Sequence, residues 1–403
     1  MNVPEIRFKE FCDYYSDVLL EKCLSVSNKK NNKLEYKKED ALSVSDEFGV
    51  VNQIEHLGRS YTGNNIFTYK ILNKGQIVYT KSPLKLKPFG IIKVNNNKPG
   101  IVSVLYAIYD VKEGFDPNYI SVYFEPNFRL NRYLLPLINK GAKNTINISD
   151  ETALSGEVHI PLSYAEQQKI ASYFQSLDSL IQTTSKELTS LKQIKAASLQ
   201  SMFPQEGETV PKVRFKGFEG EWEKIPFGSF LKESYERSTV ENEDILLSSA
   251  ITGVYLNSEL FGHQRGSSNI GYKKIKKNML ILSAQNLHLG NANVNLRFEH
   301  GLISPAYKVY EIVNISPLFL QQWIKMDSTK SFFLNATTAG ASLCRKNIVW
   351  DDLYKQIVLI PSKNEQVKIG LFFSNLDKQI SLQTQRLEKL KQIKAACLDK
   401  MFV

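Results

Sequence analysis

An internal repeat constrains this chain more than any other feature of its sequence. The segment from Ser163 to Phe203 aligns without a gap to the segment from Ser362 to Phe402, and about half of the positions are identical, including LKQIKAA. Shorter matches, VPEIRFKEF with VPKVRFKGF and GIVSVLYAIY with GLISPAYKVY, follow in the same order in both halves. A repeat of this kind reveals the unit from which an architecture is built. The chain is therefore a tandem duplication, and we expect its halves to share one fold.

The long repeat has the period of a helix. Apolar residues recur at steps of three and four, as on one helix face, and from Glu166 onward neither copy contains Gly or Pro except at Gly370. A helix of about 38 residues is roughly 57 Å long and needs a partner for its apolar stripe. The other copy is the nearest partner, so we expect an intramolecular antiparallel coiled coil. The residues of its seam are Ile170, Phe174, Leu177, Ile181, Leu188 and Leu191 in the first copy and Ile369, Phe373, Leu376, Ile380, Leu387 and Leu390 in the second.

One polar residue occupies the same seam position in each copy, Thr184 in the first and Gln383 in the second. Buried polar residues can set the register of a coiled coil. The same positions would also suit an edge that faces solvent or a partner, and both interpretations are open.

The sequence between the two long helical segments has a different pattern. Short β-rich runs such as GQIVYT and MLILS alternate there with Asn, Gly and Pro, which is typical of short strands joined by turns. Pro204 ends the first helix, and PQEGETVP reads as an exposed linker. We therefore predict an α+β protein with a pseudo-twofold repeat, in which two long antiparallel helices join two similar mixed domains. The predicted parts are a first domain at 1–162, a central helix at 163–203, a linker and opening segment at 204–222, a second domain at 223–361 and a C-terminal helix at 362–403.

The motifs of several enzyme classes are missing from the sequence. It has no GxxxxGK[ST] phosphate loop, no motif of an adenine methyltransferase and no HExxH pair, and its four cysteines form no CxxC. We expect no catalytic, cofactor-binding or metal-binding residues in this chain. Scattered carboxylates around Mg²⁺ need no short motif, so an autonomous nuclease stays open as an alternative.

Charge and hydropathy point to the partner and the compartment. The formal net charge is +10, and clustered Lys and Arg bind polyanions by releasing condensed counterions. Nucleic acid is therefore a favoured partner. No apolar run approaches the roughly 18 residues that cross a bilayer, and the amino terminus has no apolar segment of a signal peptide. We expect a cytoplasmic protein with no membrane partner.

The ordered set of repeated motifs resembles the specificity subunits of type I restriction–modification systems. The likeness covers essentially the whole chain. In that family each half opens with a P-x-[IV]-R-F-x-x-F string, here Pro4 to Phe11 and Pro211 to Phe218, and each recognition domain closes with Ile-Pro and an EQ helix, here at Pro161 and Pro361. One departure is the segment from Glu10 to Tyr15, a degraded copy of the segment from Gly217 to Trp222, which predicts different packing at the opening of the first half.

The resemblance implies a non-catalytic subunit that chooses a DNA target. Each target-recognition domain would read one half of a bipartite site in double-stranded DNA, and the paired helices would set the spacing between the half-sites. Methyltransferase subunits, two of them, would dock near the helices, and restriction subunits would join through these. This chain would carry no cofactor, while S-adenosylmethionine, ATP and Mg²⁺ would belong to the partner subunits. A coiled-coil scaffold without a DNA role is a further alternative.

Candidate DNA contacts follow from the residue types that bind phosphates and from those that read bases. Lys and Arg bind phosphates, whereas Arg or Lys on guanine and Asn or Gln on adenine read sequence. Turn-rich stretches that combine these types supply the candidates, and for each of them a solvated surface side chain is the alternative. They are Lys81, Lys85, Lys87, Lys140, Lys143 and Asn144 in the first half, and Gln264, Arg265, Lys273, Lys274, Gln285, Asn286, Arg345 and Lys346 in the second.

Two groups of lysines permit two interpretations each. The run from Lys273 to Lys277 fits a phosphate track and equally a strand edge protected by lysines. The lysines of the LKQIKAA blocks fit a surface for DNA or a methyltransferase subunit, and equally a solvated helix face. They are Lys192, Lys195, Lys391 and Lys394.

Overall fold

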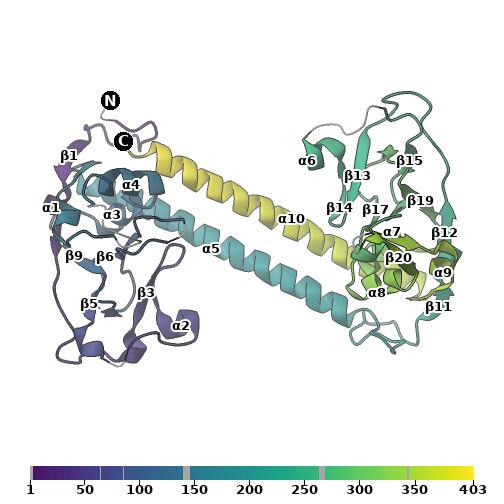
Figure 1. Cartoon of the computed structure of the whole chain (residues 1–403), viewed down its shortest axis with the longest axis horizontal. Helices are drawn as coiled ribbons and strands as arrows, with labels where there is room; N and C mark the ends of the chain where they lie inside the picture. The colour runs from purple at the N-terminus through teal and green to yellow at the C-terminus, as the bar shows by residue number, and fades with distance from the viewer. Residues whose placement is uncertain (1–2, 64, 85, 139–145, 263–267, 343–344) are drawn as a thin grey trace. The chain divides into compact units, whose positions relative to one another are not determined.

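The computed structural model describes residues 3–63, 65–84, 86–138, 146–262, 268–342 and 345–403. The chain divides into two compact units. Unit 1 consists of residues 1–185 together with 386–403, and unit 2 consists of residues 186–385. Each unit is a mixed α/β structure with small sheets, and each contains one part of both long helices (Figure 1).

The elements of unit 1 precede the first long helix. They are β1 (Ser16–Leu19), α1 (Leu20–Cys23), β2 (Leu24–Val26), η1 (Lys38–Asp40), β3 (Leu42–Ser45), β4 (Gly49–Asn52), α2 (Gln53–Leu57), η2 (Ile66–Thr68), β5 (Lys70–Leu72), β6 (Ile77–Tyr79), β7 (Ile92–Val94), β8 (Gly100–Val102), β9 (Ala107–Val111), α3 (Pro117–Tyr123), α4 (Asn127–Leu134), η3 (Thr152–Leu154) and β10 (Glu157–Ile160).

The elements of unit 2 lie between the two long helices. They are β11 (Glu223–Pro226), η4 (Phe227–Phe230), β12 (Leu231–Glu233), β13 (Leu246–Ala250), β14 (Gly253–Leu256), α6 (Asn257–Phe261), β15 (Lys273–Lys276), β16 (Leu280–Ser283), η5 (Leu287–Leu289), β17 (Ala292–Val294), β18 (His300–Ile303), β19 (Tyr307–Ile312), α7 (Pro317–Trp323), α8 (Ser328–Leu334), β20 (Thr337–Ser342), β21 (Arg345–Ile348), α9 (Trp350–Lys355) and β22 (Ile357–Ile360).

The sheets of the two units follow corresponding orders. A four-stranded sheet runs β2-β9-β6-β7 in unit 1 and β12-β19-β16-β17 in unit 2. The first and last strands of each unit pair antiparallel, β1 with β10 and β11 with β22. Unit 2 has a second four-stranded sheet, β14-β13-β18-β15, whereas unit 1 has the pairs β3-β4 and β5-β8 linked by a parallel bridge from Ala41 to Ile101. Two short strands, β20 and β21, form a further pair in unit 2.

Local chemistry explains why the helices of the domains begin where they do. Asp116 caps α3 because its Oδ1 accepts a hydrogen bond from the Tyr119 amide at 2.8 Å, and Pro117 follows as the first helical residue. Ser316 and Pro317 start α7 in the same way. By contrast, β6 and β16 are buried along their whole length, as expected for continuous apolar runs in the middle of a sheet.

The two long helices are α5 (Tyr164–Ser201) and α10 (Lys363–Lys400), so the sequence-based prediction of two such helices is confirmed. In unit 1, Phe174 of α5 lies near Phe402, with ring centroids 6.0 Å apart. In unit 2, Phe373 of α10 lies 6.1 Å from Phe203. Each unit therefore packs the first part of one long helix against the end of the other.

The core of each unit is continuous with these helices. In unit 1 the side chains of the four-stranded sheet, α3 and α4 cluster with Ile170, Phe174 and Leu177 of α5 and with Met401 and Phe402. Unit 2 has the corresponding cluster. All twelve predicted seam residues are buried or half-buried. Thr184 is buried, and Gln383 is half-buried and donates a hydrogen bond to Glu187 Oε2 at 3.1 Å.

The only glycine of the long repeats has a packing reason. A Cβ on Gly370 would lie 2.7 Å from Leu318 Cβ and 2.9 Å from the Phe319 amide nitrogen. Glycine there lets the start of α7 approach the backbone of α10 closely. Ala171 occupies the matching position of the first copy and is buried. Among the described helices, none is both long enough and apolar enough to span a bilayer.

Candidate nucleic-acid interface

The repeated Arg and Glu of the two halves form the joint between each opening segment and its long helix. Arg7 donates from Nε and Nη2 to the two carboxylate oxygens of Glu166 at 2.7 and 2.8 Å. Arg214 binds Glu365 in the same bidentate way at 2.6 and 2.7 Å. Both glutamates are buried, and a buried carboxylate needs such a partner. These pairs fix the opening segments onto the first turns of α5 and α10.

The glutamine that follows each glutamate also holds the start of the long helix, through hydrogen bonds to two other segments. Gln167 accepts a hydrogen bond from the Asp116 amide at 2.9 Å and donates to the Pro161 carbonyl at 2.8 Å. Gln366 makes the corresponding bonds to Ser316 and to Pro361. The EQ pair of the sequence is therefore a structural clamp between α3 or α7, the preceding strand and the long helix.

The expected difference between the two opening segments is smaller than the sequences indicate. Tyr15 and Trp222 are both buried beside these clamps, at 1% and 3% exposure. The Tyr15 hydroxyl contacts Glu166 and the Met401 carbonyl at 3.4 Å, whereas the Trp222 indole nitrogen has no partner among the described residues. The two segments thus differ at this aromatic residue, whereas the arginine clamp, which lies outside the segment from Glu10 to Tyr15, is the same in both halves.

Two LKQIKAA lysines hold ion pairs inside the units. In unit 1, Lys394 of α10 contacts Asp178 of α5 and Glu125, both at 2.5 Å. In unit 2, Lys195 of α5 contacts Asp377 of α10 at 2.5 Å. The two contacts are equivalent, because the lysine comes from α10 and the aspartate from α5 in unit 1, and the reverse holds in unit 2. Of the four LKQIKAA lysines, the other two, Lys192 and Lys391, are exposed.

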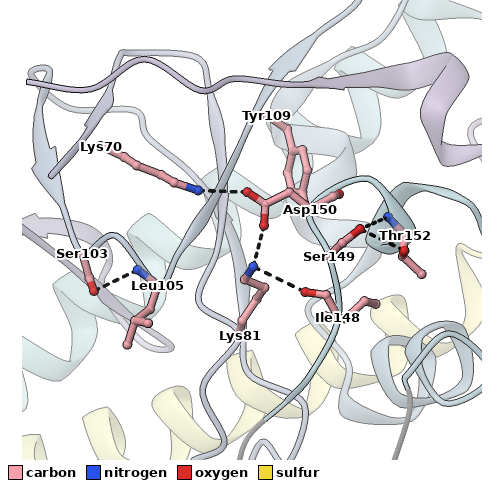
Figure 2. A network of polar contacts seen from close by, with 9 residues as sticks. All are labelled: Lys70, Lys81, Ser103, Leu105, Tyr109, Ile148, Ser149, Asp150 and Thr152. Carbon is pink, nitrogen blue, oxygen red and sulfur yellow. Dashed lines mark hydrogen bonds and ion pairs between the residues drawn. The ribbon is translucent and has the colours of Figure 1, made fainter. Parts of the chain in front are cut away.

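The candidate Lys81 lies in a polar network just beyond the end of β6 in unit 1. Asp150 accepts hydrogen bonds from Lys70 Nζ at 2.9 Å and from Lys81 Nζ at 2.5 Å (Figure 2). Burial raises the pKa of Asp150, but the hydrogen bonds from the two lysines outweigh it and hold that pKa below its usual range. The Asp150 carbonyl also accepts a bond from the Tyr109 hydroxyl at 3.2 Å. Lys81 therefore has a stabilising partner within unit 1 itself.

The matching place in unit 2 is built from different residues. Tyr310 of β19 corresponds to Tyr109 of β9, and its hydroxyl lies 2.7 Å from that of Tyr354. Lys308 donates to Glu233 at 2.9 Å and lies 4.4 Å from the centre of the Trp350 ring. A hollow of about 700 Å³ adjoins Glu233, Tyr310 and Tyr354. The equivalent tyrosines Tyr109 and Tyr310 are therefore surrounded by different side chains in the two units.

The lysine run of unit 2 is neutralised by carboxylates. Lys273 is buried near Glu233, Lys274 contacts Glu243, Lys276 lies 3.5 Å from Glu236, and Lys277 contacts Glu299. These residues belong to or follow β15, which is the edge strand of its sheet. These ion pairs are compatible with a strand edge protected by lysines, and the phosphate track stays open as the other interpretation.

The other candidates differ in accessibility. Lys87 donates to the Glu125 carbonyl at 2.7 Å and is half-buried. Gln285 is exposed, while Asn286 and Lys346 are half-buried. Arg345 lies in β21. Lys85, Lys140, Lys143, Asn144, Gln264 and Arg265 lie outside the described residues.

A basic loop of unit 1 was missed by the sequence reasoning. Residues 27–41 join β2 to β3 and include Lys29, Lys30 and Lys33, all exposed. The signal was present as NKKNNKLEYKK, which combines Lys and Asn. In the part of the chain that is described, no three His, Cys, Asp or Glu side chains are grouped so as to hold a metal ion.

Comparison with solved structures identifies the architecture. The chain is similar to the S subunit of a type I restriction–modification system from M. genitalium, with a TM-score of 0.58 over 100% of this chain and 99% of that chain at 13% identity. The fold is that of a type I S subunit. The S-subunit likeness extends over both units.

Two other solved structures match with lower scores. The HsdS subunit from Thermoanaerobacter tengcongensis has a TM-score of 0.43 at 14% identity, covering 96% of both chains. A chain from a structure titled for the complex assembly and conformational transition of the type I R-M system has a TM-score of 0.44 at 14% identity, covering 96% of this chain and 97% of that one. No protein-family model and no curated protein matches the sequence.

Proposed function

We propose that this chain is the DNA specificity subunit of a type I restriction–modification complex. The observation that carries the proposal is the likeness to an S subunit over the full length of both chains. The net charge of +10 supports a polyanionic partner. On this proposal the chain selects the target and leaves methyl transfer and cleavage to other subunits.

The proposal extends to a bipartite target. The two units repeat the same clamps, Arg7 to Glu166 and Arg214 to Glu365, while the side chains beside Tyr109 and Tyr310 differ. Two similar frames with different surfaces are what two different half-sites require, since base readout depends on the side chains presented to the groove. Unit 1 would read one half-site and unit 2 the other.

The long helices would pair as an antiparallel coiled coil that spaces the half-sites. Their exposed Lys192 and Lys391 are candidates for contacts with methyltransferase subunits, through which restriction subunits would join. S-adenosylmethionine, ATP and Mg²⁺ would be bound by those partners. The predicted division at 1–162, 163–203, 204–222, 223–361 and 362–403 belongs to the same proposal.

The experiment that tests the proposal is a map of methylated adenines in a host that carries the partner genes, with and without this chain. We expect a bipartite methylated sequence that appears only when the chain is present. Identical maps would contradict the proposal. Cleavage of plasmid DNA by the purified chain with Mg²⁺ alone would instead favour the nuclease alternative, and absence of any DNA binding would favour the scaffold.

A further inference from the structure

The loop between the second and third strands of unit 1 has a counterpart in unit 2 that begins with the same backbone contacts. Residues 27–41 join β2 to β3, and residues 234–245 join β12 to β13. Both loops are fixed by the same backbone hydrogen bonds. These are Ser27 N to Ile108 O at 2.8 Å, Asn31 N to Tyr69 O at 2.9 Å and Ile71 N to Lys29 O at 2.9 Å in unit 1, and Ser234 N to Val309 O at 2.8 Å, Ser238 N to Tyr272 O at 2.8 Å and Lys274 N to Glu236 O at 3.0 Å in unit 2.

The two loops carry opposite charge on this shared backbone. The loop of unit 1 contains five lysines and three carboxylates, whereas the loop of unit 2 contains four carboxylates and one arginine. The bridges Lys30 to Lys70 and Arg237 to Lys273, with the hydrogen bonds above, align residues 27–31 with residues 234–238. Lys29 in unit 1 therefore stands where Glu236 stands in unit 2.

The carboxylates of the unit 2 loop are committed to their own unit. Glu236 and Glu243 contact Lys276 and Lys274 of the neighbouring strand, and Asp244 contacts His300 at 2.6 Å. Glu241 accepts a hydrogen bond from the Asn269 amide at 3.1 Å. This loop therefore places carboxylates beside an edge strand, and its one cation, Arg237, donates to the Gly271 carbonyl at 2.9 Å.

Three lysines of the unit 1 loop, Lys29, Lys30 and Lys33, have no carboxylate partner of this kind among the described residues. Lys29, Lys30 and Lys33 are exposed, and none of them has a carboxylate within 4.0 Å in the described part of the chain. Uncompensated lysines on one loop raise the local potential and attract a polyanion. The loop of unit 1 thus has the charge that the loop of unit 2 lacks.

The backbone of the unit 1 loop is held in place without help from these lysines. Asn31 is 0% exposed. Its side chain donates to the Tyr36 carbonyl at 2.9 Å and accepts from the Tyr36 amide at 3.0 Å, which closes the loop around it. A loop that is ordered before binding loses less conformational entropy when it meets a ligand.

We propose that loop 27–41 of unit 1 binds the phosphate backbone of duplex DNA and that loop 234–245 of unit 2 does not. The inference rests on the proposed function, because it assumes that the chain binds duplex DNA. It adds that the two units bind their half-sites unequally, with the salt-dependent part of the affinity concentrated in unit 1. Recognition by unit 2 then depends more on groove contacts, which release fewer counterions.

The test measures the affinity of the purified full chain for a mixed-sequence DNA duplex of about 40 base pairs, between about 50 and 200 mM salt. The loop variant is Lys29→Gln, Lys30→Gln and Lys33→Gln in one chain. The control variant removes the same charge at exposed lysines outside the loop, Lys22→Gln, Lys216→Gln and Lys224→Gln. Each phosphate contact contributes about 0.9 to the slope of log affinity against log salt.

We expect the loop variant to lower this slope by about 2 to 3, and the control to lower it by less than about 1. Replacing the three loop lysines by arginine should keep the wild-type slope, because the charge is retained. An unchanged slope in the loop variant, or an equal loss in the control, would overturn the loop proposal while leaving the proposed function intact. A wild-type chain that binds the duplex with no salt dependence would overturn the proposed function itself.

Discussion

Glu166 and Glu365 lie in the first turns of the two long helices, and each receives two hydrogen bonds from an arginine far away in the sequence. The side chain of Glu365 is 0% exposed, and that of Arg214 is 14% exposed. Breaking a buried pair by removing one partner leaves an uncompensated charge, which is far more destabilising than the net contribution of the intact pair. The two arginines are therefore sensitive positions of the joints, because without them the buried glutamates would lose their cations.

Arg214→Gln should destabilise unit 2 by about 3 to 5 kcal/mol, because Glu365 would remain buried without its cation. Urea unfolding followed by a probe within unit 2 measures the effect. Arg297→Gln is the matched control, since Arg297 and Glu259 form an exposed bidentate pair and exposed pairs contribute little. Equal shifts of the midpoint in the two variants would contradict the role assigned to Arg214.

Asp150 gives unit 1 a stability that depends on pH. Its pKa is depressed in the folded state relative to the ordinary value of 3.8, so the folded state favours the ionised form. The stability that this provides is fully present above the ordinary pKa and is lost as the pH falls through the lower folded pKa. Asp150→Asn should therefore destabilise unit 1 at pH about 6 and make progressively less difference below about pH 4.

Urea unfolding of the wild type and of Asp150→Asn across this pH range tests that expectation. Asp13→Asn, at an exposed position, serves as the control for general effects of charge removal. A difference between wild type and Asp150→Asn that stays constant from neutral to acid pH would show that Lys70 and Lys81 do not stabilise the carboxylate.

Sequence reasoning found the candidate lysines by type and local context, and the structure shows why this was not enough. The partner of Lys81 is 69 residues away at Asp150, and that of Lys394 is 269 residues away at Glu125. Whether a lysine is free for DNA depends on such distant carboxylates, which no local pattern contains. Lys29, Lys30 and Lys33 were overlooked for the same reason, because only the structure shows that no carboxylate of the described residues lies beside them.

At the scale of elements, the long helices were the most predictable part of the chain. Their apolar period is contained within each segment, so α5 and α10 could be located to within a few residues from the sequence alone. The strands are three to six residues long, and their ends are set by pairing with distant strands. The sequence therefore indicated β texture between the helices but not the order β2-β9-β6-β7.

The buried faces of the long helices give a sharp prediction. Leu177→Asp and Leu376→Asp each place an unpaired charge at a residue that is at most 8% exposed, so each should cost its unit at least about 3 kcal/mol. Leu180→Asp and Leu382→Asp are matched controls on the same helices, where the leucines are 44% and 56% exposed. Thermal unfolding of the four variants tests this, and the packing described for the helices would be wrong if all four unfolded at the same temperature.

At the scale of the whole molecule, the proposed spacing role of the helices predicts a change of target. Insertion of four residues into the middle of both α5 and α10 would lengthen each helix by about 6 Å, which corresponds to roughly two base pairs. We expect the methylated sequence in the host to keep its half-sites and to change its spacer. An unchanged spacer would contradict the spacing role while leaving the recognition role in place.

A second prediction at this scale follows because unit 1 is built from two separate stretches of the chain. Cys397, Met401 and Phe402 are part of its core, although they are separated in the sequence from its other residues by the whole of unit 2. Deletion of residues 393–403 should therefore make unit 1 sensitive to limited proteolysis while unit 2 stays protected. Deletion of Val403 alone, which is 43% exposed, should leave both units protected, and cleavage of unit 2 first in the longer deletion would contradict the division into units.

The same discontinuity governs the order in which the protein can be completed during translation. Unit 2 is one uninterrupted stretch of chain, whereas the segment that fills the core of unit 1 emerges from the ribosome only after every residue of unit 2. The amino-terminal part of unit 1 is synthesised first, but its apolar face stays uncovered until the final helix has been synthesised. Nascent chains stalled within α10 should accordingly expose unit 1, and not unit 2, to chaperones and proteases.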